Sequence, residues 1–257
     1  MPPTTIFLAP LAILAVALLM RRADAPPLER IHALLSGRAA PWFFGLVSAL
    51  IVWFAWGSIA QIGVFHDERA YLLQAEIFAS GRWVAAGRPL PEFFQQMHVL
   101  VSPVLAAKYA PGHALLLAPG ALVGLPGLMP LMLTGVSGAL VFALARRIAT
   151  VWVALLTWLL WTTTTDTLQW HGSYFSEVTT AALVLVAWWG LLRWRDASDR
   201  RMLYLVAAAV GWGAITRPLT MLAFAIPIGV VVLRHTMARG AWRDLARAAT
   251  IGTLILC

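Results

Sequence analysis

Two adjacent carboxylates, Asp67 and Glu68, follow directly after a long apolar run. Carboxylates in such a position can accept a proton from a hydroxyl group, or they can bind a divalent ion. A structural interpretation is equally open: Asp67 as the N-cap of a helix, with Glu68 in the first turn, where the helix dipole favours negative charge. The two interpretations do not exclude each other.

Two other charged residues stand at the ends of apolar runs. Glu177 begins one such run, where a carboxylate is costly enough to predict a functional partner, although a capping or snorkelling role is the alternative. Arg217 precedes Pro218 between two apolar stretches. Its planar guanidinium suits a phosphate, or it could instead hold the carbonyl groups at a helix end. Without a bound phosphate, Glu177 is expected to offset the charge of Arg217. Asp166 is expected to be simply solvated.

Lysine and histidine give weaker signals. Lys108 is the only lysine beside eighteen arginines, which suggests either a site that needs a compact ammonium group or an ordinary interfacial lysine. His66, His98 and His113 could bind a metal, but no tight spacing connects them. The only cysteine, Cys257, excludes an intrachain disulfide and a cysteine-based metal site.

The composition determines the kind of element that must position these residues. Of 257 residues, 61% are hydrophobic and 12% charged, with a mean hydropathy of +0.80. This is too apolar for one water-soluble core. The net charge of +8 does not indicate nucleic-acid binding, because the basic residues are scattered between apolar runs. The sequence therefore predicts an all-α, polytopic membrane protein.

A membrane span needs about 20 predominantly apolar residues. The runs that meet this need predict helices over 3–20, 42–65, 127–145, 149–165 and 175–192, and two shorter helices within 202–233 that meet at Arg217-Pro218. A last apolar run from Ala248 stops at Cys257, too early to span. We expect about seven complete transmembrane helices and a truncated eighth, in a single membrane domain over 1–257.

The arginines predict how this domain is oriented. If the helices alternate strictly, fourteen of the nineteen basic residues lie on one side, which the positive-inside rule assigns to the cytoplasm. The linker 21–41 is then a cytoplasmic loop. The opposite side receives the long segment 66–126, the loop 166–174 and the Arg217 corner.

The segment 66–126 is predicted to hold interfacial helices. Asp67 and Glu68 open a short amphipathic helix that Gly81 ends, and one helical face carries Tyr71, Leu72, Ala75, Phe78 and Ala79. The run from Ala114 to Leu125 is too short to span and is expected to break at Pro119-Gly120. Such a surface suits a substrate with a lipid tail and a polar head.

Several motifs resemble the GT-C glycosyltransferases, in particular the aminoarabinose transferase, protein O-mannosyltransferase and Rgt-type branches. The resemblance covers about residues 45–235. It rests on Asp67-Glu68-Arg69-Ala70-Tyr71 with Ala75 and Ala79-Ser80-Gly81, on Lys108-Tyr109-Ala110-Pro111-Gly112-His113-Ala114-Leu115-Leu116, on Ser176-Glu177 and on Thr216-Arg217-Pro218. Two features depart from the family: an extra span precedes the usual first helix, and the later helices and C-terminal domain are missing. In addition, Ala110 replaces a proline.

The resemblance implies a glycosyltransferase that moves a sugar from a polyprenyl-phosphate donor to the hydroxyl of a lipid, glycan or protein acceptor. It implies catalytic roles for Asp67, Glu68 and Glu177, with Asp67 as general base. Lys108 and Arg217 are expected to bind the donor phosphate, and Tyr71, Tyr109 and His113 to support the substrate site. A divalent ion shared by Asp67 and Glu177 is one option, and no organic cofactor is expected. The implied location is the bacterial inner membrane, with the active face outward.

Two other functions compete with this one. A lipid or solute transporter would place charged or small-residue motifs at mid-depth in its spans and would show inverted repeats, whereas here the charged outer residues gather at one surface and no repeat is visible. A non-catalytic regulatory subunit is the third candidate.

Overall fold

The computed structural model describes residues 14, 18, 26–57 and 63–256. Within these residues it is mainly α-helical and contains three short strands. The chain divides into two compact units. The predicted span 3–20 lies almost entirely outside the described residues.

The first unit comprises the chain up to Ser58 and residues 131–173. Its helices are α2 (Pro26–Ser36), α3 (Ala40–Trp56), most of α6 (Leu128–Ile148), α7 (Val151–Thr163) and α8 (Thr165–His171). Phe44 lies at the centre of its core, with ring centroids 4.2 Å from Phe142 and 4.6 Å from Trp158. Helices α3 and α6 approach so closely that a Cβ atom on Gly45 would lie 2.5 Å from the carbonyl oxygen of Gly135.

The second unit comprises residues 59–130 and 174–257. Its elements are α4 (His66–Ala79), β1 (Ala85–Ala86), the 3₁₀ turn η1 (Pro91–Phe93), β2 (Val99–Leu100), β3 (Val104–Ala107), α5 (Gly112–Leu122), α9 (Ser176–Ala197), α10 (Arg200–Ala214), α11 (Pro218–Arg239) and α12 (Trp242–Leu256). The strands form a small antiparallel sheet in the order β1-β3-β2. This sheet packs on α4, because Val99 and Leu105 are buried together with Ala70.

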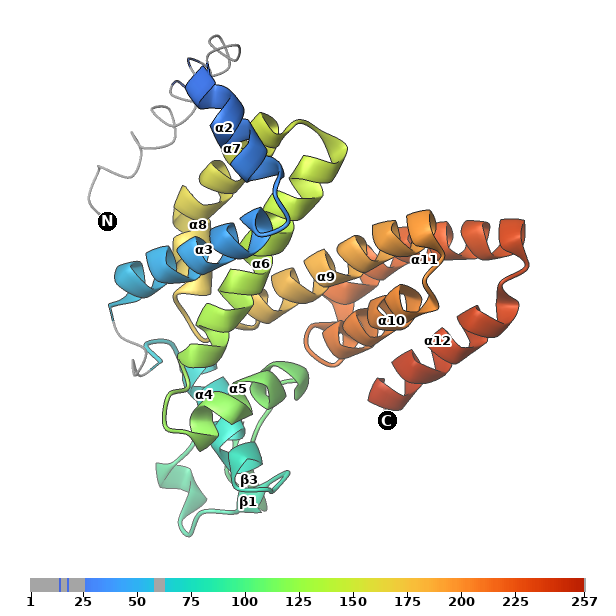
Figure 1. Cartoon of the computed structure of the whole chain (residues 1–257). Coiled ribbons are helices and arrows are strands. Elements are labelled where there is room, and N and C mark those ends of the chain that lie inside the picture. The colour runs from blue at the N-terminus through green and yellow to red at the C-terminus, as the bar shows by residue number, and fades with distance from the viewer. Residues whose placement is uncertain (1–13, 15–17, 19–25, 58–62, 257) are drawn as a thin grey trace. The chain divides into compact units, whose positions relative to one another are not determined.

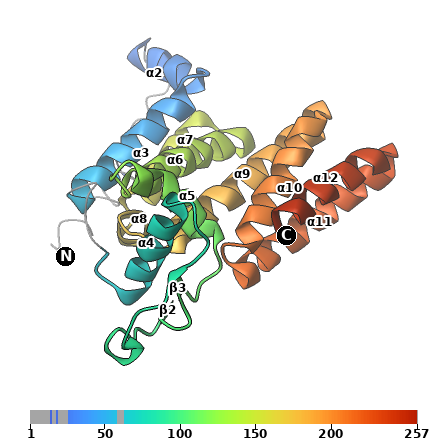
Figure 2. The same ribbon diagram turned by 90° about the horizontal axis from the view of Figure 1, so that it is seen from below.

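Helices α9 to α12 lie side by side in Figures 1 and 2 and share one apolar core. Leu191 and Trp194 of α9 pack there with Leu203 of α10 and with Ile228 and Val232 of α11.

Two predicted boundaries are confirmed. The predicted break at Arg217-Pro218 separates α10, which ends at Ala214, from α11, which begins at Pro218. Proline suits this first helical position, because the amide hydrogen that it lacks would have no partner there. Helix α4 ends just before Gly81, whose φ of +75° favours glycine.

Three predicted connections are wrong. The linker 21–41 contains α2, since Pro26 and Pro27 are tolerated in a first helical turn and Leu28 and Leu35, one heptad apart, are both buried. The loop 166–174 contains α8. Helix α5 does not break at Pro119 but continues to Leu122, because a proline so near the end of a helix removes only one hydrogen bond.

Several helix bounds also differ from prediction. Helix α3 ends at Trp56, before Gly57 with its φ of +88°, and not at residue 65. Helix α12 begins at Trp242, ahead of the apolar run that starts at Ala248. Helices α6 and α11 are long and apolar enough to cross a membrane, and up to four spans result if the α2–α3 and α8–α9 pairs each form one span. The described helices therefore indicate a membrane protein.

Candidate functional site

The adjacent carboxylates Asp67 and Glu68 have different surroundings. Helix α4 begins after the N-cap residue Phe65, so the prediction that Asp67 is the N-cap is wrong. Glu68 is only 4% exposed, and its Oε2 accepts hydrogen bonds from the backbone amides of Val64 and Phe65, both at 2.9 Å. Its Oε1 accepts a third from the amide of Tyr174, also at 2.9 Å. Glu68 thus anchors the start of α4 to the segment before α9, which argues against its predicted catalytic role.

Asp67 remains partly accessible and has a histidine partner. Its Oδ1 lies 2.8 Å from Nε2 of His98, and the two side chains are 39% and 27% exposed. The His98 ring stacks on Tyr109 with centroids 5.1 Å apart, and Tyr109 stacks on Tyr71 at 4.6 Å. A row of three rings therefore runs from Asp67 into the protein.

Both tyrosines of this row are held in the protonated form. Burial, a hydrogen bond to Asp67 and the charge of Asp67 raise the pKa of Tyr109 above its usual value. Burial is also the largest cause of the raised pKa of Tyr71. The hydroxyl of Tyr71 lies 3.2 Å from Oγ of Ser176, at the start of α9. The row thus offers hydroxyl groups as hydrogen-bond donors but no phenolate.

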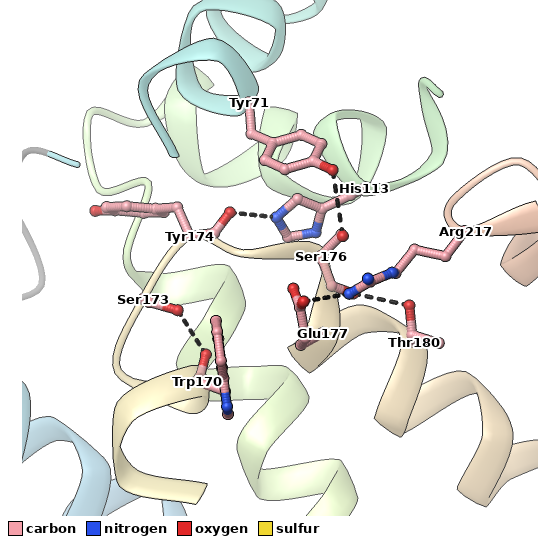
Figure 3. Close-up of polar contacts among 9 residues, drawn as sticks. All are labelled: Tyr71, His113, Trp170, Ser173, Tyr174, Ser176, Glu177, Thr180 and Arg217. Carbon is pink, nitrogen blue, oxygen red and sulfur yellow. Dashed lines mark hydrogen bonds and ion pairs between the residues drawn. The ribbon is translucent and has the colours of Figure 1, made fainter. Parts of the chain in front are cut away.

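His113 closes the inner side of the cluster (Figure 3). The side chain is fully buried, with Nδ1 2.7 Å from Oγ1 of Thr179 and Nε2 2.7 Å from the carbonyl oxygen of Tyr174. Its ring meets Tyr71 edge-on at 4.7 Å. Burial lowers the pKa of His113 to about 4, so the imidazole is neutral at pH 7. Both ring nitrogens are occupied, and His113 therefore positions Tyr71 and α9 rather than binding a metal.

Glu177 and Arg217 form an ion pair, as the sequence predicted (Figure 3). The two side chains are 32% and 38% exposed, so solvent reaches both charges. The corner that carries Arg217 is fixed by Gly112, whose amide donates to the carbonyl oxygen of Ile215 at 2.8 Å. A Cβ atom at Gly112 would lie only 2.5 Å from Oγ1 of Thr216, so glycine permits this close approach.

These charges belong to one cluster around Tyr71. The negative charges of Asp67 and Glu177 raise the pKa of Tyr71 and the positive charge of Arg217 lowers it, after the larger effects of burial and of the Ser176 hydrogen bond. Three charged groups from α4, α9 and the α10–α11 corner, two of them acidic and one basic, thus act on the same tyrosine.

Lys108 has a different position. Its Nζ donates to the carbonyl oxygen of Met97 at 3.0 Å, and its backbone amide donates to that of His98 at 2.9 Å. These contacts place the exposed ammonium beside the segment that carries His98. Neither of these contacts is with Arg217.

Sequence reasoning missed the partnership of Asp67 with His98, because they lie thirty-one positions apart and no periodicity connects them. Within the part of the chain that the structure describes, no group of three or more His, Cys, Asp or Glu residues could hold a metal ion.

Comparison with known proteins finds no matching family model, no similar curated protein and no similar solved structure.

Proposed function

We propose that this protein is a membrane glycosyltransferase that moves a sugar from a polyprenyl-phosphate donor to an acceptor hydroxyl. The observation that carries the proposal is the cluster of Asp67, Glu177 and Arg217 around Tyr71, built from three separate segments of one unit. It combines a partly exposed carboxylate, which can take a proton, with a guanidinium that can bind a phosphate.

Asp67 acts as the general base in this proposal. It removes the proton from the acceptor hydroxyl as the oxygen attacks the anomeric carbon of the donor sugar. The new bond joins that oxygen to the anomeric carbon, and the bond from this carbon to the phosphate oxygen breaks, which inverts the anomeric configuration. His98, 2.8 Å from Asp67, orients the carboxylate.

Arg217 binds the departing phosphate. The leaving group is already an anion, so it needs positive charge more than a proton, and a positioned cation supplies that stabilisation. Glu177 forms an ion pair with Arg217 until the donor binds. The donor phosphate then replaces Glu177 as the partner of the guanidinium. Lys108 is proposed to add a second positive charge when donor is bound.

In this proposal the protein has about seven transmembrane helices and lies in a bacterial inner membrane. Segments 66–126 and the Arg217 corner face outward, and the acceptor is a lipid, glycan or protein. The two long helices α6 and α11 support the membrane location.

The test is release of free polyprenyl phosphate when the reconstituted chain is incubated with a lipid-linked sugar and candidate acceptors. We expect release by the wild type and none by Asp67→Asn of equal folded yield. Movement of the intact donor across the bilayer without bond cleavage would show that the protein is a transporter and not a glycosyltransferase. Binding of donor with neither outcome would favour the regulatory subunit.

A further inference from the structure

A second charged region lies at the arginine-rich end of helices α9 to α12. This end holds eight arginines and three aspartates: Arg193, Arg195, Arg200, Arg201, Arg234, Arg239, Arg243 and Arg247, with Asp196, Asp199 and Asp244. The positive-inside rule accounts for an excess of arginine here but not for any cavity among the helices.

A cavity is nevertheless present between α9 and α11. It has a volume of about 360 Å³ and is lined by Arg195, Val231, Arg234, His235 and Ala238. Two arginines and a histidine thus contribute to one concave site, together with the small apolar surfaces of a valine and an alanine.

His235 supplies a second, independent observation. Its ring packs edge-on against Trp194 with centroids 4.5 Å apart, which fixes it between α9 and α11. Its Nε2 is buried and has no hydrogen-bond partner among the described residues. An unsatisfied buried polar nitrogen is costly, and the residue that carries it also lines the cavity.

The helix packing keeps this site in shape. Trp194 and Val232 belong to the core shared by α9, α10 and α11, and Trp194 directly precedes Arg195 in α9. Beyond them, Arg239 donates to Oγ of Ser198, which joins the end of α11 to the end of α9. The cavity is therefore bounded by fixed elements rather than by a loose surface.

We infer that this cavity binds the phosphate group of an anionic phospholipid, with Arg195, Arg234 and His235 as its ligands. Basic pockets between membrane helices on the cytoplasmic side suit such headgroups, and a guanidinium matches phosphate oxygens in geometry. The inference does not depend on the proposed glycosyl transfer, because the residues concerned are separate from Asp67, Glu177 and Arg217.

The experiment compares lipid binding to the purified full chain in zwitterionic detergent. Short-chain phosphatidylglycerol, short-chain phosphatidylcholine and inorganic phosphate are titrated separately, with the thermal midpoint as readout. The test variant is Arg195→Gln with Arg234→Gln. The matched control is Arg200→Gln with Arg201→Gln, which removes the same charge from exposed residues of α10.

We expect phosphatidylglycerol to raise the thermal midpoint of the wild type and of the control variant at similar concentrations. Phosphatidylcholine should stabilise neither protein. The test variant should need roughly 30-fold more phosphatidylglycerol, the loss expected for two arginines near an anionic lipid surface. Equal weakening of both double variants would overturn the inference in favour of diffuse attraction. Stabilisation by inorganic phosphate at the same concentrations would overturn the inference that the ligand is a lipid. The cavity would then be a binding site for a free anion.

Discussion

Each unit contains a cluster of polar groups, and the two clusters differ in charge and exposure. In the first unit Ser48 is fully buried, donates to the carbonyl oxygen of Phe44 and accepts from Nε1 of Trp158, both at 2.8 Å. In the second unit the carboxylate of Asp67 and the charges of Glu177 and Arg217 are each about one-third exposed.

This difference in charge and exposure distinguishes polar groups that stabilise the fold from polar groups that can bind a ligand. A neutral, buried and satisfied hydroxyl stabilises its surroundings and has no reason to exchange its partner. A charged pair that solvent reaches gains little net stability from its ion pair, so its partners can be replaced by a ligand at small cost.

The largest effect is expected for Asp67→Asn, which removes the proposed base. Transfer should fall about 10²- to 10⁴-fold, the usual contribution of general base catalysis. Initial rates are measured at matched folded protein. Glu76→Gln, an exposed carboxylate on the same helix, should retain wild-type activity, and an active Asp67→Asn enzyme would remove Asp67 from the mechanism.

Acid should destabilise the second unit through His113. The pKa of this histidine in the folded state is about 4, below the usual 6.5, because burial disfavours the charged ring. The unfolded state therefore takes up the proton first, so the stabilisation is complete above pH 6.5 and is lost as the pH falls toward 4, about 3 kcal/mol in all. The readout is the unfolding free energy of wild type and His113→Gln between pH 4 and 8.

His66→Gln, a variant of an exposed histidine, is the control for this pH series. It should leave the slope unchanged, whereas His113→Gln should flatten it. A wild-type slope that survives in His113→Gln would assign the acid sensitivity to other groups.

Glu68→Gln should affect stability more than chemistry, unlike the change at its neighbour. The uncharged amide accepts poorly from three backbone amides, so the unfolding free energy should fall by about 2 kcal/mol. Transfer per folded molecule should stay within about twofold of wild type. Loss of transfer in a fully folded Glu68→Gln protein would instead support the catalytic role that the sequence predicted.

Arg217→Lys should keep the ion pair with Glu177 but lose the bidentate geometry toward phosphate. We expect about a tenfold rise in the donor KM, and a larger loss for Arg217→Ala. Donor titrations at saturating acceptor measure both, with Arg243→Lys at an exposed arginine of α12 as control. Unchanged donor handling in both Arg217 variants would make this residue a structural corner.

The smallest effect is expected in the neutral cluster of the first unit. Thr162→Val removes a long hydrogen bond, 3.4 Å from Oγ1 of Thr162 to Oγ of Ser48, and keeps the side-chain shape. Stability should fall by about 1 kcal/mol or less, with unchanged transfer. A clear loss of transfer here would show that the neutral cluster also serves the reaction.

Local sequence preferences were enough to predict two helix boundaries. The break at Arg217-Pro218 and the end of α4 before Gly81 both follow from the backbone preferences of single residues. The strands β1 to β3 could not be predicted, because each has only two to four residues and depends on pairing across the segment. Helix α2 was missed because Pro26 and Pro27 favour a loop as readily as a helix start.

The candidate site was predictable only where a charged residue stands at the end of an apolar run. That signal singled out Asp67, Glu177 and Arg217, and it also predicted the Glu177–Arg217 pair. It could not separate Asp67 from Glu68, since only tertiary contacts show that three backbone amides surround Glu68. The same limit hid His98, whose relevance depends on its distance from Asp67.

The hydrogen bond from Tyr174 to Glu68 joins residues 106 positions apart, and this sets an order of events during synthesis. At about 5–20 residues per second, Glu68 is added to the chain roughly 5 to 20 seconds before Tyr174. For that interval one oxygen of Glu68 lacks its distant partner and the start of α4 is not joined to α9. The enzyme that we propose would therefore gain its reaction centre only after Tyr174, Glu177 and Arg217 have been made and inserted.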